Sequence, residues 1–245
     1  MNAPLALLHG YPFNHRMWDK VKALLPSDLQ VLAPDLPGMG RPASDQIPSI
    51  EVMADAVKAE LELKNIPRAV IAGFSMGGYV ALAFAEKYAT AVKAFILVNS
   101  QAAADSEEMR QGRRRMVETI RAKGIAPALE AAIPKMFARG KPVPEDLAVV
   151  PRKAAEQFGP EGLMYALEAM ARRPDRTAVL KSVPGPVLII HSAEDQFIPA
   201  ERARLLAGEI KNAEYVEIPG AGHATPLEAS EAVARAIVNF ITRLS

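Results

Sequence analysis

Residues 69–84 read AVIAGFSMGGYVALAF, and this stretch decides the fold. An apolar run leads into a glycine-rich turn that contains Ser75, and a second apolar run follows. The first run has the length of a buried strand, and the second has that of a helix covered on most sides. Glycines at 73, 77 and 78 surround the serine, and small neighbours of this kind let a helix approach a strand closely. We therefore interpret the turn as a nucleophile elbow with Ser75 at its tip.

Five further apolar runs are spaced along the chain, with helical patterns between them. They are continuously apolar rather than alternating, as expected for strands of a sheet that is covered on both faces. The alternation of strands and helices predicts an α/β fold with a mostly parallel, doubly wound sheet of about six strands. The five runs are Pro4–His9, Leu29–Pro34, Ala94–Val98, Val187–His191 and Tyr215–Ile218.

Two helices have clear start signals. One is predicted to begin after Ser49, because apolar residues then recur at helical spacing along one stripe. The other is predicted to run from Pro226 to about Leu244, with Thr225 and Glu228 forming a capping box at its start. Residues 101–182 contain several helical patterns and no convincing strand, which indicates a helical insertion over one end of the sheet.

The composition of the chain excludes several classes of function. Lysine and arginine number 29 and aspartate and glutamate 28, so the net charge of +1 favours neither a nucleic-acid nor a membrane partner. The 245 residues include no cysteine, which rules out disulfides, thiolate metal sites and cysteine nucleophiles. Residues 1–10 show neither a basic leader nor a long apolar core, so we expect a cytoplasmic protein without a targeting segment.

A serine hydroxyl becomes a good nucleophile only when a base takes its proton. His223 lies in a glycine-rich loop after the last predicted strand and is the preferred base, whereas His191 ends an apolar strand and is interpreted as structural. The base needs an acceptor that orients its ring, and Asp195 follows a strand at the same edge of the sheet. The neighbouring Glu194 is the weaker candidate for this acceptor. The order Ser, Asp, His along the chain is the one used by this architecture.

Acyl transfer through a serine creates an oxyanion that two backbone N–H groups must face. We assign one of them to Met76, the residue after the nucleophile, and the other to Tyr11, in the loop after the first strand. His9 is interpreted as a residue that orients this loop rather than as a catalyst. No pair of histidines has the spacing of metal ligands, so neither a metal nor another cofactor is predicted.

Together these residues resemble the α/β-hydrolase family. The loop 9–12 combined with the elbow is similar to the branch that contains serine carboxylesterases, enol-lactonases and cofactor-free haloperoxidases or perhydrolases. Dehalogenases and epoxide hydrolases of the family have an aspartate at the position of Ser75, so the serine implies acyl chemistry. The matches, which span nearly the whole chain, are His9–Gly10, the turn Asp35–Gly40, Ser75, Asp195 within Glu194–Pro199, and His223.

The resemblance implies a core domain of residues 1–100 and 183–245, with residues 101–182 forming a helical cap over the active site. One departure from the family is expected: most relatives have a hairpin before the first strand, and this sequence begins almost at that strand, so the sheet should lack its first edge strands. The expected activity is that of a carboxylesterase: Ser75 attacks a small ester, thioester or lactone, and water then cleaves the acyl-enzyme. Four apolar cap residues could touch such a substrate, but core packing explains them equally well: Met136, Phe137, Leu163 and Met164.

Two other functions fit the same residues. An enol-lactonase or a perhydrolase would use the same triad, and the perhydrolase is suggested by Tyr11–Pro12 beside the oxyanion site. A non-catalytic ligand-binding protein on a hydrolase scaffold is the third hypothesis. The arginines at 110 and 113–115 could attract an acyl-carrier partner, but we favour a solvent-exposed helix face as their explanation.

Overall fold

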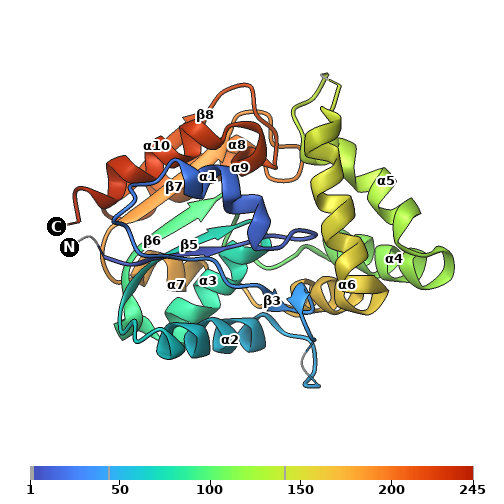
Figure 1. Cartoon of the computed structure of the whole chain (residues 1–245), viewed down its shortest axis with the longest axis horizontal. Helices are drawn as coiled ribbons and strands as arrows, with labels where there is room; N and C mark the ends of the chain where they lie inside the picture. The colour runs from blue at the N-terminus through green and yellow to red at the C-terminus, as the bar shows by residue number, and fades with distance from the viewer. Residues whose placement is uncertain (1–2, 44, 141, 245) are drawn as a thin grey trace.

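The six apolar runs form one parallel sheet in the order β2-β1-β5-β6-β7-β8 (Figure 1), which confirms the predicted fold class. This computed structural model describes residues 3–43, 45–140 and 142–244. The edge strand β2 is shorter than its apolar run, because only two residues pair with β1. The strands of the sheet are β1 (Leu5–Leu8), β2 (Val31–Leu32), β5 (Ala69–Phe74), β6 (Val92–Val98), β7 (Val187–Ser192) and β8 (Ala213–Ile218).

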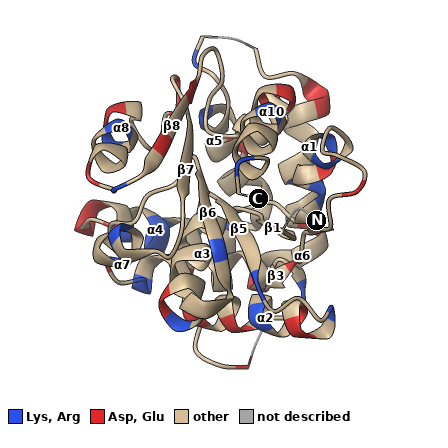
Figure 2. Cartoon of the chain, turned by 90° about the vertical axis from the view of Figure 1, so that its left-hand side faces the viewer, with Lys and Arg blue, Asp and Glu red and all other residues tan. Residues whose placement is uncertain are grey.

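Helices cover both faces of the sheet. In Figure 1, α1 and α10 lie on one face and α2 and α3 on the other. Every residue of β1, β5 and β7 is accordingly buried, and in Figure 2 charged residues colour the outer helices while β5 and β7 stay tan. Double coverage explains why these strands are continuously apolar. The helices are α1 (Asp19–Ala23), α2 (Ile50–Leu63), α3 (Met76–Lys87), α8 (Ala200–Gly208) and α10 (Ser230–Ile241).

The helix predicted after Ser49 is confirmed as α2, and the Ser49 side chain accepts a hydrogen bond from the backbone of Val52 (3.2 Å). A short turn of 3₁₀ helix, His15–Trp18, precedes α1. The structure also has a small parallel pair that the sequence patterns do not indicate, β3 (Leu36–Pro37) with β4 (Gly40–Arg41).

The prediction of a single helix from Pro226 to about Leu244 is wrong. The chain forms α9 (Thr225–Glu228), leaves helical geometry at Ala229 and restarts as α10. Thr225 is also not the cap of this helix: Ala224 holds the cap position without a side-chain hydrogen bond, and the Thr225 hydroxyl donates to the carbonyl of Gly222 (2.7 Å). The carboxylate of Glu228 instead accepts from the backbone of Gly222 (2.7 Å) and of Ala138 (3.0 Å). Buried backbone groups in the preceding loop need partners, and these two side chains supply them.

In the described part of the segment between β6 and β7, the chain forms four helices. Three of them, α4, α5 and α6, pack together at one end of the sheet, opposite the end where both termini lie (Figure 1). The shorter α7 packs against α3. Within the described residues, no helix is both long and apolar enough to cross a membrane. The four helices are α4 (Glu107–Lys123), α5 (Ile125–Met136), α6 (Glu145–Arg172, kinked at Gly159) and α7 (Thr177–Ser182).

At the turn between β5 and α3, backbone atoms of neighbouring segments lie in direct contact. A Cβ atom on Gly77 would lie 2.2 Å from the carbonyl oxygen of Leu8, and one on Gly73 would lie 2.3 Å from the carbonyl oxygen of Gly77. The start of α3 therefore touches both β1 and β5 without any side chain between them. Only glycine fits at these two positions, which is the physical reason for the glycines around Ser75.

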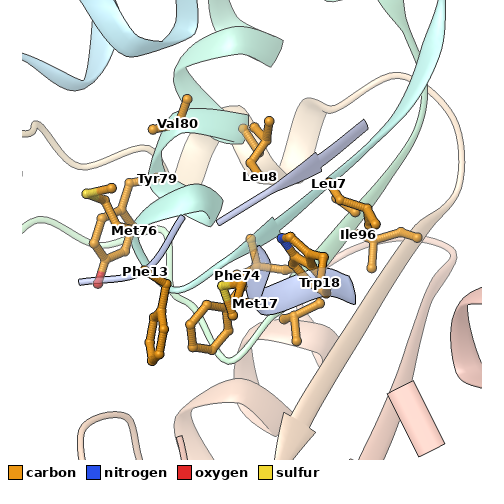
Figure 3. Close-up of a cluster of buried hydrophobic side chains, with 14 of the residues drawn as sticks. Leu7, Leu8, Phe13, Met17, Trp18, Phe74, Met76, Tyr79, Val80 and Ile96 are labelled. Atoms are coloured by element: carbon orange, nitrogen blue, oxygen red, sulfur yellow. The ribbon is translucent and has the colours of Figure 1, made fainter. Parts of the chain in front are cut away.

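Aromatic side chains fill the space beneath this turn. Figure 3 shows Phe74 with Phe13 and Trp18, and the three rings meet edge to face at centroid distances of 6.0 and 6.5 Å. All three side chains are fully buried. Edge-to-face contacts add to the free energy gained from burial, so they fix the position of the strand end that carries Ser75.

Replacing Gly77 by alanine should lower the free energy of unfolding by at least about 2 kcal/mol, because the new methyl group meets backbone that cannot move aside. Urea unfolding measures the change. Gly208→Ala is the matched control, since nothing lies within 4 Å of a Cβ there. Gly208 ends α8, and alanine in a helix stabilises by up to about 1 kcal/mol. Equal effects of the two substitutions would contradict the close approach of α3.

Candidate active site

Ser75 stands at the turn between β5 and α3 with φ 50° and ψ −115°. This conformation is sparsely populated for a residue with a side chain and costs about 1–3 kcal/mol. Two hydrogen bonds hold it: the amide of Ser75 donates to the carbonyl of Val98 (3.0 Å), and the Ser100 hydroxyl donates to the carbonyl of Ser75 (2.7 Å). The serine is thus fixed at the carboxyl edge of the sheet by the last residue of β6 and by Ser100, which follows that strand.

His223 follows β8 and reaches Ser75 from the adjacent loop. Its Nε2 lies 2.8 Å from the Ser75 hydroxyl, and its Nδ1 lies 2.8 Å from a carboxylate oxygen of Asp195. The imidazole ring is held between Phe74 and Phe197, at centroid distances of 5.2 and 5.0 Å. The structure therefore brings together the three side chains that the sequence patterns single out.

Asp195 is fully buried at its side chain and well supplied with donors. One carboxylate oxygen accepts from the amides of Phe197 (2.8 Å) and Ile198 (3.0 Å), and the other accepts from His223 and from Asn99. Burial alone would raise the pKa of Asp195, but the charge of His223 and these hydrogen bonds lower it to about 2. The carboxylate is ionised at neutral pH and can only accept, so Nδ1 of His223 carries the proton and Nε2 can accept from Ser75.

Asn99 is the contact that sequence reasoning missed. It directly follows β6 with φ 43°, and its amide donates to Asp195 (2.9 Å) and to the Ser192 hydroxyl (2.7 Å). Ser192 in turn donates to the carbonyl of Gly222 (2.6 Å), next to His223. Asn99 and Ser192 together thereby link the residues that follow β6 and β7 to the loop after β8. The available signal was a polar residue immediately after a buried strand, beside strands whose ends carry Ser75 and Asp195.

Neither alternative candidate bonds to Ser75 or His223, although Nε2 of His191 lies 3.6 Å from the Asp195 carboxylate. His191 is fully buried, and its Nε2 donates to the carbonyl of Ile198 (2.8 Å), which agrees with a structural role. Burial lowers the pKa of His191 and keeps the ring neutral. Glu194 lies beside Asp195 in sequence, but the carboxylate that reaches His223 is that of Asp195.

The loop after β1 passes directly against Ser75. A Cβ atom on Gly10 would lie 3.0 Å from that of Ser75 and 2.7 Å from the Phe74 ring. His9 holds the loop: its Nε2 accepts from the amide of Leu36 (3.0 Å), and its Nδ1 donates to the carbonyl of Gly10 (3.1 Å). These are the contacts of an orienting residue. Burial lowers the pKa of His9 to about 4, so the ring is neutral at pH 7.

A pocket of about 400 Å³ opens onto Ser75 and His223, a size typical of small-molecule sites. Four methionines from the three helices over the sheet make much of its wall, and the remaining lining is also largely apolar. Of the predicted cap contacts, Met136 lines the pocket, whereas Phe137, Leu163 and Met164 are not among its lining residues. Nowhere in the described ranges do three His, Asp or Glu side chains gather as a metal site. The lining is Tyr11, Ser75, Tyr79, Met109, Gly112, Arg113, Met116, Ala132, Met136, Leu167, Met170, Gln196, Phe197, Ile198 and His223.

The arginine run on α4 divides in two. Arg114 and Arg115 are exposed, as the interpretation of a solvated face requires. That interpretation is wrong for Arg113, whose side chain is only 18% exposed and lines the pocket. The difference arises because Arg113 pairs with Asp105, a fully buried carboxylate near the start of α4.

A parallel sheet in this order, with a serine at the turn after its central strand and an acid and a histidine on later loops, defines an α/β hydrolase. Comparison with known proteins agrees. Residues 5–236 match the model of the alpha/beta hydrolase family, so the chain belongs to this family, and the resemblance seen in the sequence is confirmed.

Three similar proteins illustrate the range of the relatives. An esterase from Thermogutta terrifontis, solved with malate bound, has a TM-score of 0.93 and 32% identity, covering 100% of this chain and 91% of its own. The enol-lactonase from Burkholderia xenovorans LB400 has a TM-score of 0.85 and 27% identity, covering 99% and 92%. A pimeloyl-(acyl-carrier protein) methyl ester esterase from Neisseria meningitidis is 30% identical over 96% of this chain and 92% of its own.

Because His9 is buried and neutral, we expect the free energy of unfolding to fall in mild acid. Its pKa falls from the ordinary 6.5 to about 4 in the folded protein, so the unfolded chain binds more protons between these values. The contribution of His9 is therefore complete above pH 6.5 and is lost as the pH falls towards 4, by about 3 kcal/mol. The difference between the unfolding free energies of wild type and His9→Gln, measured against pH, should show this slope. Parallel curves would mean that His9 is protonated as easily in the folded protein as in the unfolded one.

Proposed function

We propose that the chain is a serine hydrolase that cleaves carboxylic esters. The observation that carries this proposal is the unbroken hydrogen-bonded series from the Ser75 hydroxyl through His223 to the ionised carboxylate of Asp195. This series opens into a pocket large enough for a small substrate. The esterases among the similar proteins support the same reaction class.

In the first half-reaction, the Ser75 oxygen attacks the ester carbonyl while Nε2 of His223 takes the hydroxyl proton. Asp195 stays ionised and stabilises the imidazolium through its hydrogen bond to Nδ1. The carbonyl oxygen becomes an oxyanion, for which we assign the amides of Tyr11 and Met76 as donors. The carbon–oxygen bond to the alcohol then breaks, and His223 returns the proton to the departing alkoxide.

In the second half-reaction, water attacks the acyl-enzyme and His223 takes a proton from it. Collapse of the tetrahedral intermediate releases the carboxylic acid, and the proton returns to the Ser75 oxygen. We assign residues 101–182 as a cap over residues 1–100 and 183–245, because α4, α5 and α6 supply much of the pocket wall. The apolar part of that wall favours a substrate with an apolar body.

Lactone hydrolysis and perhydrolysis are the second candidate. Both start from the same acyl-enzyme; a lactone keeps its leaving alcohol attached, and hydrogen peroxide replaces water in perhydrolysis. The enol-lactonase among the similar proteins and the loop at Tyr11–Pro12 favour this candidate. Peracid formation from an ester and peroxide, measured beside lactone opening, distinguishes the branches.

An ester whose acyl group is attached to an acyl-carrier protein is a further candidate substrate. The relative from Neisseria meningitidis is a pimeloyl-(acyl-carrier protein) methyl ester esterase. Arg115 and Arg121 are exposed basic side chains on α4, a helix that also lines the pocket, and they would suit an acidic carrier. Hydrolysis of one methyl ester with and without an attached carrier tests this candidate.

Ser75→Ala should reduce hydrolysis of short para-nitrophenyl esters by about 10⁴-fold or more, because the nucleophile is lost while the fold is kept. A fluorophosphonate probe should label the wild type and not the variant. Hydrolysis that survives in Ser75→Ala would end the proposal. Turnover of esters, lactones and peroxide too slow to detect in the wild type would instead favour the ligand-binding hypothesis.

Asn99→Ala should lower kcat about tenfold with little change in KM, because the lost amide leaves Asp195 and His223 less firmly oriented. Asn65→Ala is the matched control. Asn65 is also an asparagine at positive φ (53°), but it is exposed and lies at the end of α2. Both variants carry similar backbone strain, so an equal loss of activity in the two would argue against a positioning role for Asn99.

A further inference from the structure

Arg113 brings a charged group into a pocket that is otherwise largely apolar. Its two neighbours on α4, Arg114 and Arg115, are exposed, whereas Arg113 turns inward and shares the pocket with Ser75 and His223. A guanidinium in a desolvated wall is costly unless it is paired. The charges around Arg113 therefore decide what it can bind.

Two guanidinium groups share one carboxylate. Asp105 is fully buried and accepts from Arg113 (Nε, 2.5 Å; Nη2, 3.3 Å) and from Arg173 (Nη1, 2.6 Å), whose side chain is 2% exposed. The three groups together carry one net positive charge, and Arg113 is the member that lines the pocket. Asp175 also interacts electrostatically with Arg173, but it is exposed and accepts from the amide of Thr177.

The donors that face the pocket have only weak partners there. Nη1 of Arg113 donates to the sulfur of Met170 (3.3 Å), and the Tyr11 hydroxyl donates to the sulfur of Met116 (3.8 Å). A thioether is a poor acceptor, so an oxygen acceptor from a ligand would replace it with a gain in free energy. Burial raises the pKa of Tyr11 against the opposing effect of the nearby Arg113 charge, so the hydroxyl remains a donor at neutral pH.

We propose that Arg113 and the Tyr11 hydroxyl bind a carboxylate on the substrate. The preferred substrates are then esters that carry a second, free carboxylate, either in the acyl part or in the alcohol part. This inference rests on the proposed ester hydrolysis at Ser75 and specifies its substrate class. Asp105 occupies the Nε–Nη2 side of the Arg113 guanidinium, so Nη1 is the group that would donate to the substrate. A charged donor binds a carboxylate more strongly than a hydroxyl group, and a methyl group cannot accept from it at all.

The test compares charged and neutral esters of the same shape in two arms. In the acyl arm, the para-nitrophenyl monoester of glutaric acid is compared with para-nitrophenyl valerate. In the alcohol arm, para-acetoxybenzoate is compared with para-tolyl acetate. Each is assayed with the wild type, with Arg113→Met and with Arg114→Met, which removes an equal charge from the exposed face of the same helix.

In one of the two arms, Arg113→Met should lower the ratio of kcat/KM for the charged ester to that for the neutral ester about 10- to 100-fold. The change should appear mainly in KM, and the arm that responds identifies the part of the substrate that carries the carboxylate. Arg114→Met should leave both ratios within about twofold of the wild type. Inhibition of the wild type by free glutarate or benzoate should weaken in Arg113→Met by a similar factor.

Three results would overturn the inference. Unchanged ratios in Arg113→Met, with neutral esters still cleaved, would reject the carboxylate site while leaving the proposed hydrolysis intact. An equal change in Arg114→Met would assign the effect to the general field of the helix. Absence of turnover of any ester by the wild type would reject the hydrolysis itself. A melting curve would reveal whether Arg113→Met folds. If it does not, Arg113→Lys takes its place, because lysine keeps the charge but lacks the several N–H groups of a guanidinium. The ratio of kcat/KM for the charged ester to that for the neutral ester should then fall about tenfold.

Discussion

The backbone contact between the start of α3 and strands β1 and β5 is the constraint on which the site depends. Because Gly77 lies against the carbonyl of Leu8, the chain can turn from β5 into α3 only within a very small space. That turn forces Ser75 into a conformation that ordinary residues avoid, and the residue therefore projects from the sheet edge instead of packing into the core. The aromatic cluster of Phe13, Trp18 and Phe74 offsets the strain by fixing the strand from below.

The parallel pairing of the strands places the other residues of the site at the same sheet edge as Ser75. Phe74 pairs with Val98, and Val98 with Ile190, so the residues that follow these strands emerge in a row at one edge. In such a row, a single carboxylate can collect donors from several loops at once. Asp195 does so, and its carboxylate therefore stays ionised at neutral pH although it is buried. The imidazole ring of His223 is thus oriented by its hydrogen bond to Asp195 and by the two aromatic rings between which it lies.

The parts of this arrangement that the sequence could predict are those written in local patterns. Ser75 lies in a strand–turn–helix motif, and Asp195 and His223 follow apolar strands, so each has a short-range signal that places it at the same edge. Asn99 also follows an apolar strand, but the sequence does not show that its partners are Ser192 and Asp195, which lie far along the chain. The inward turn of Arg113 depends on the burial of Asp105, which the helical pattern does not reveal although the two residues are only eight apart. The break at Ala229 was missed because the backbone of the preceding loop uses the side chains that a helix cap would otherwise use.

The two halves of the site differ in rigidity, and this difference bears on selectivity. The reacting groups are held by backbone contacts and short hydrogen bonds, so they suit any ester carbonyl that reaches Ser75. The opposite wall is rich in methionine, which adapts its shape to many apolar groups and discriminates weakly among them. A fixed cation in such a wall, which we propose Arg113 to be, separates ligands by charge rather than by size. Discrimination by this chain should therefore depend more on where a substrate carries negative charge than on the length of its apolar part.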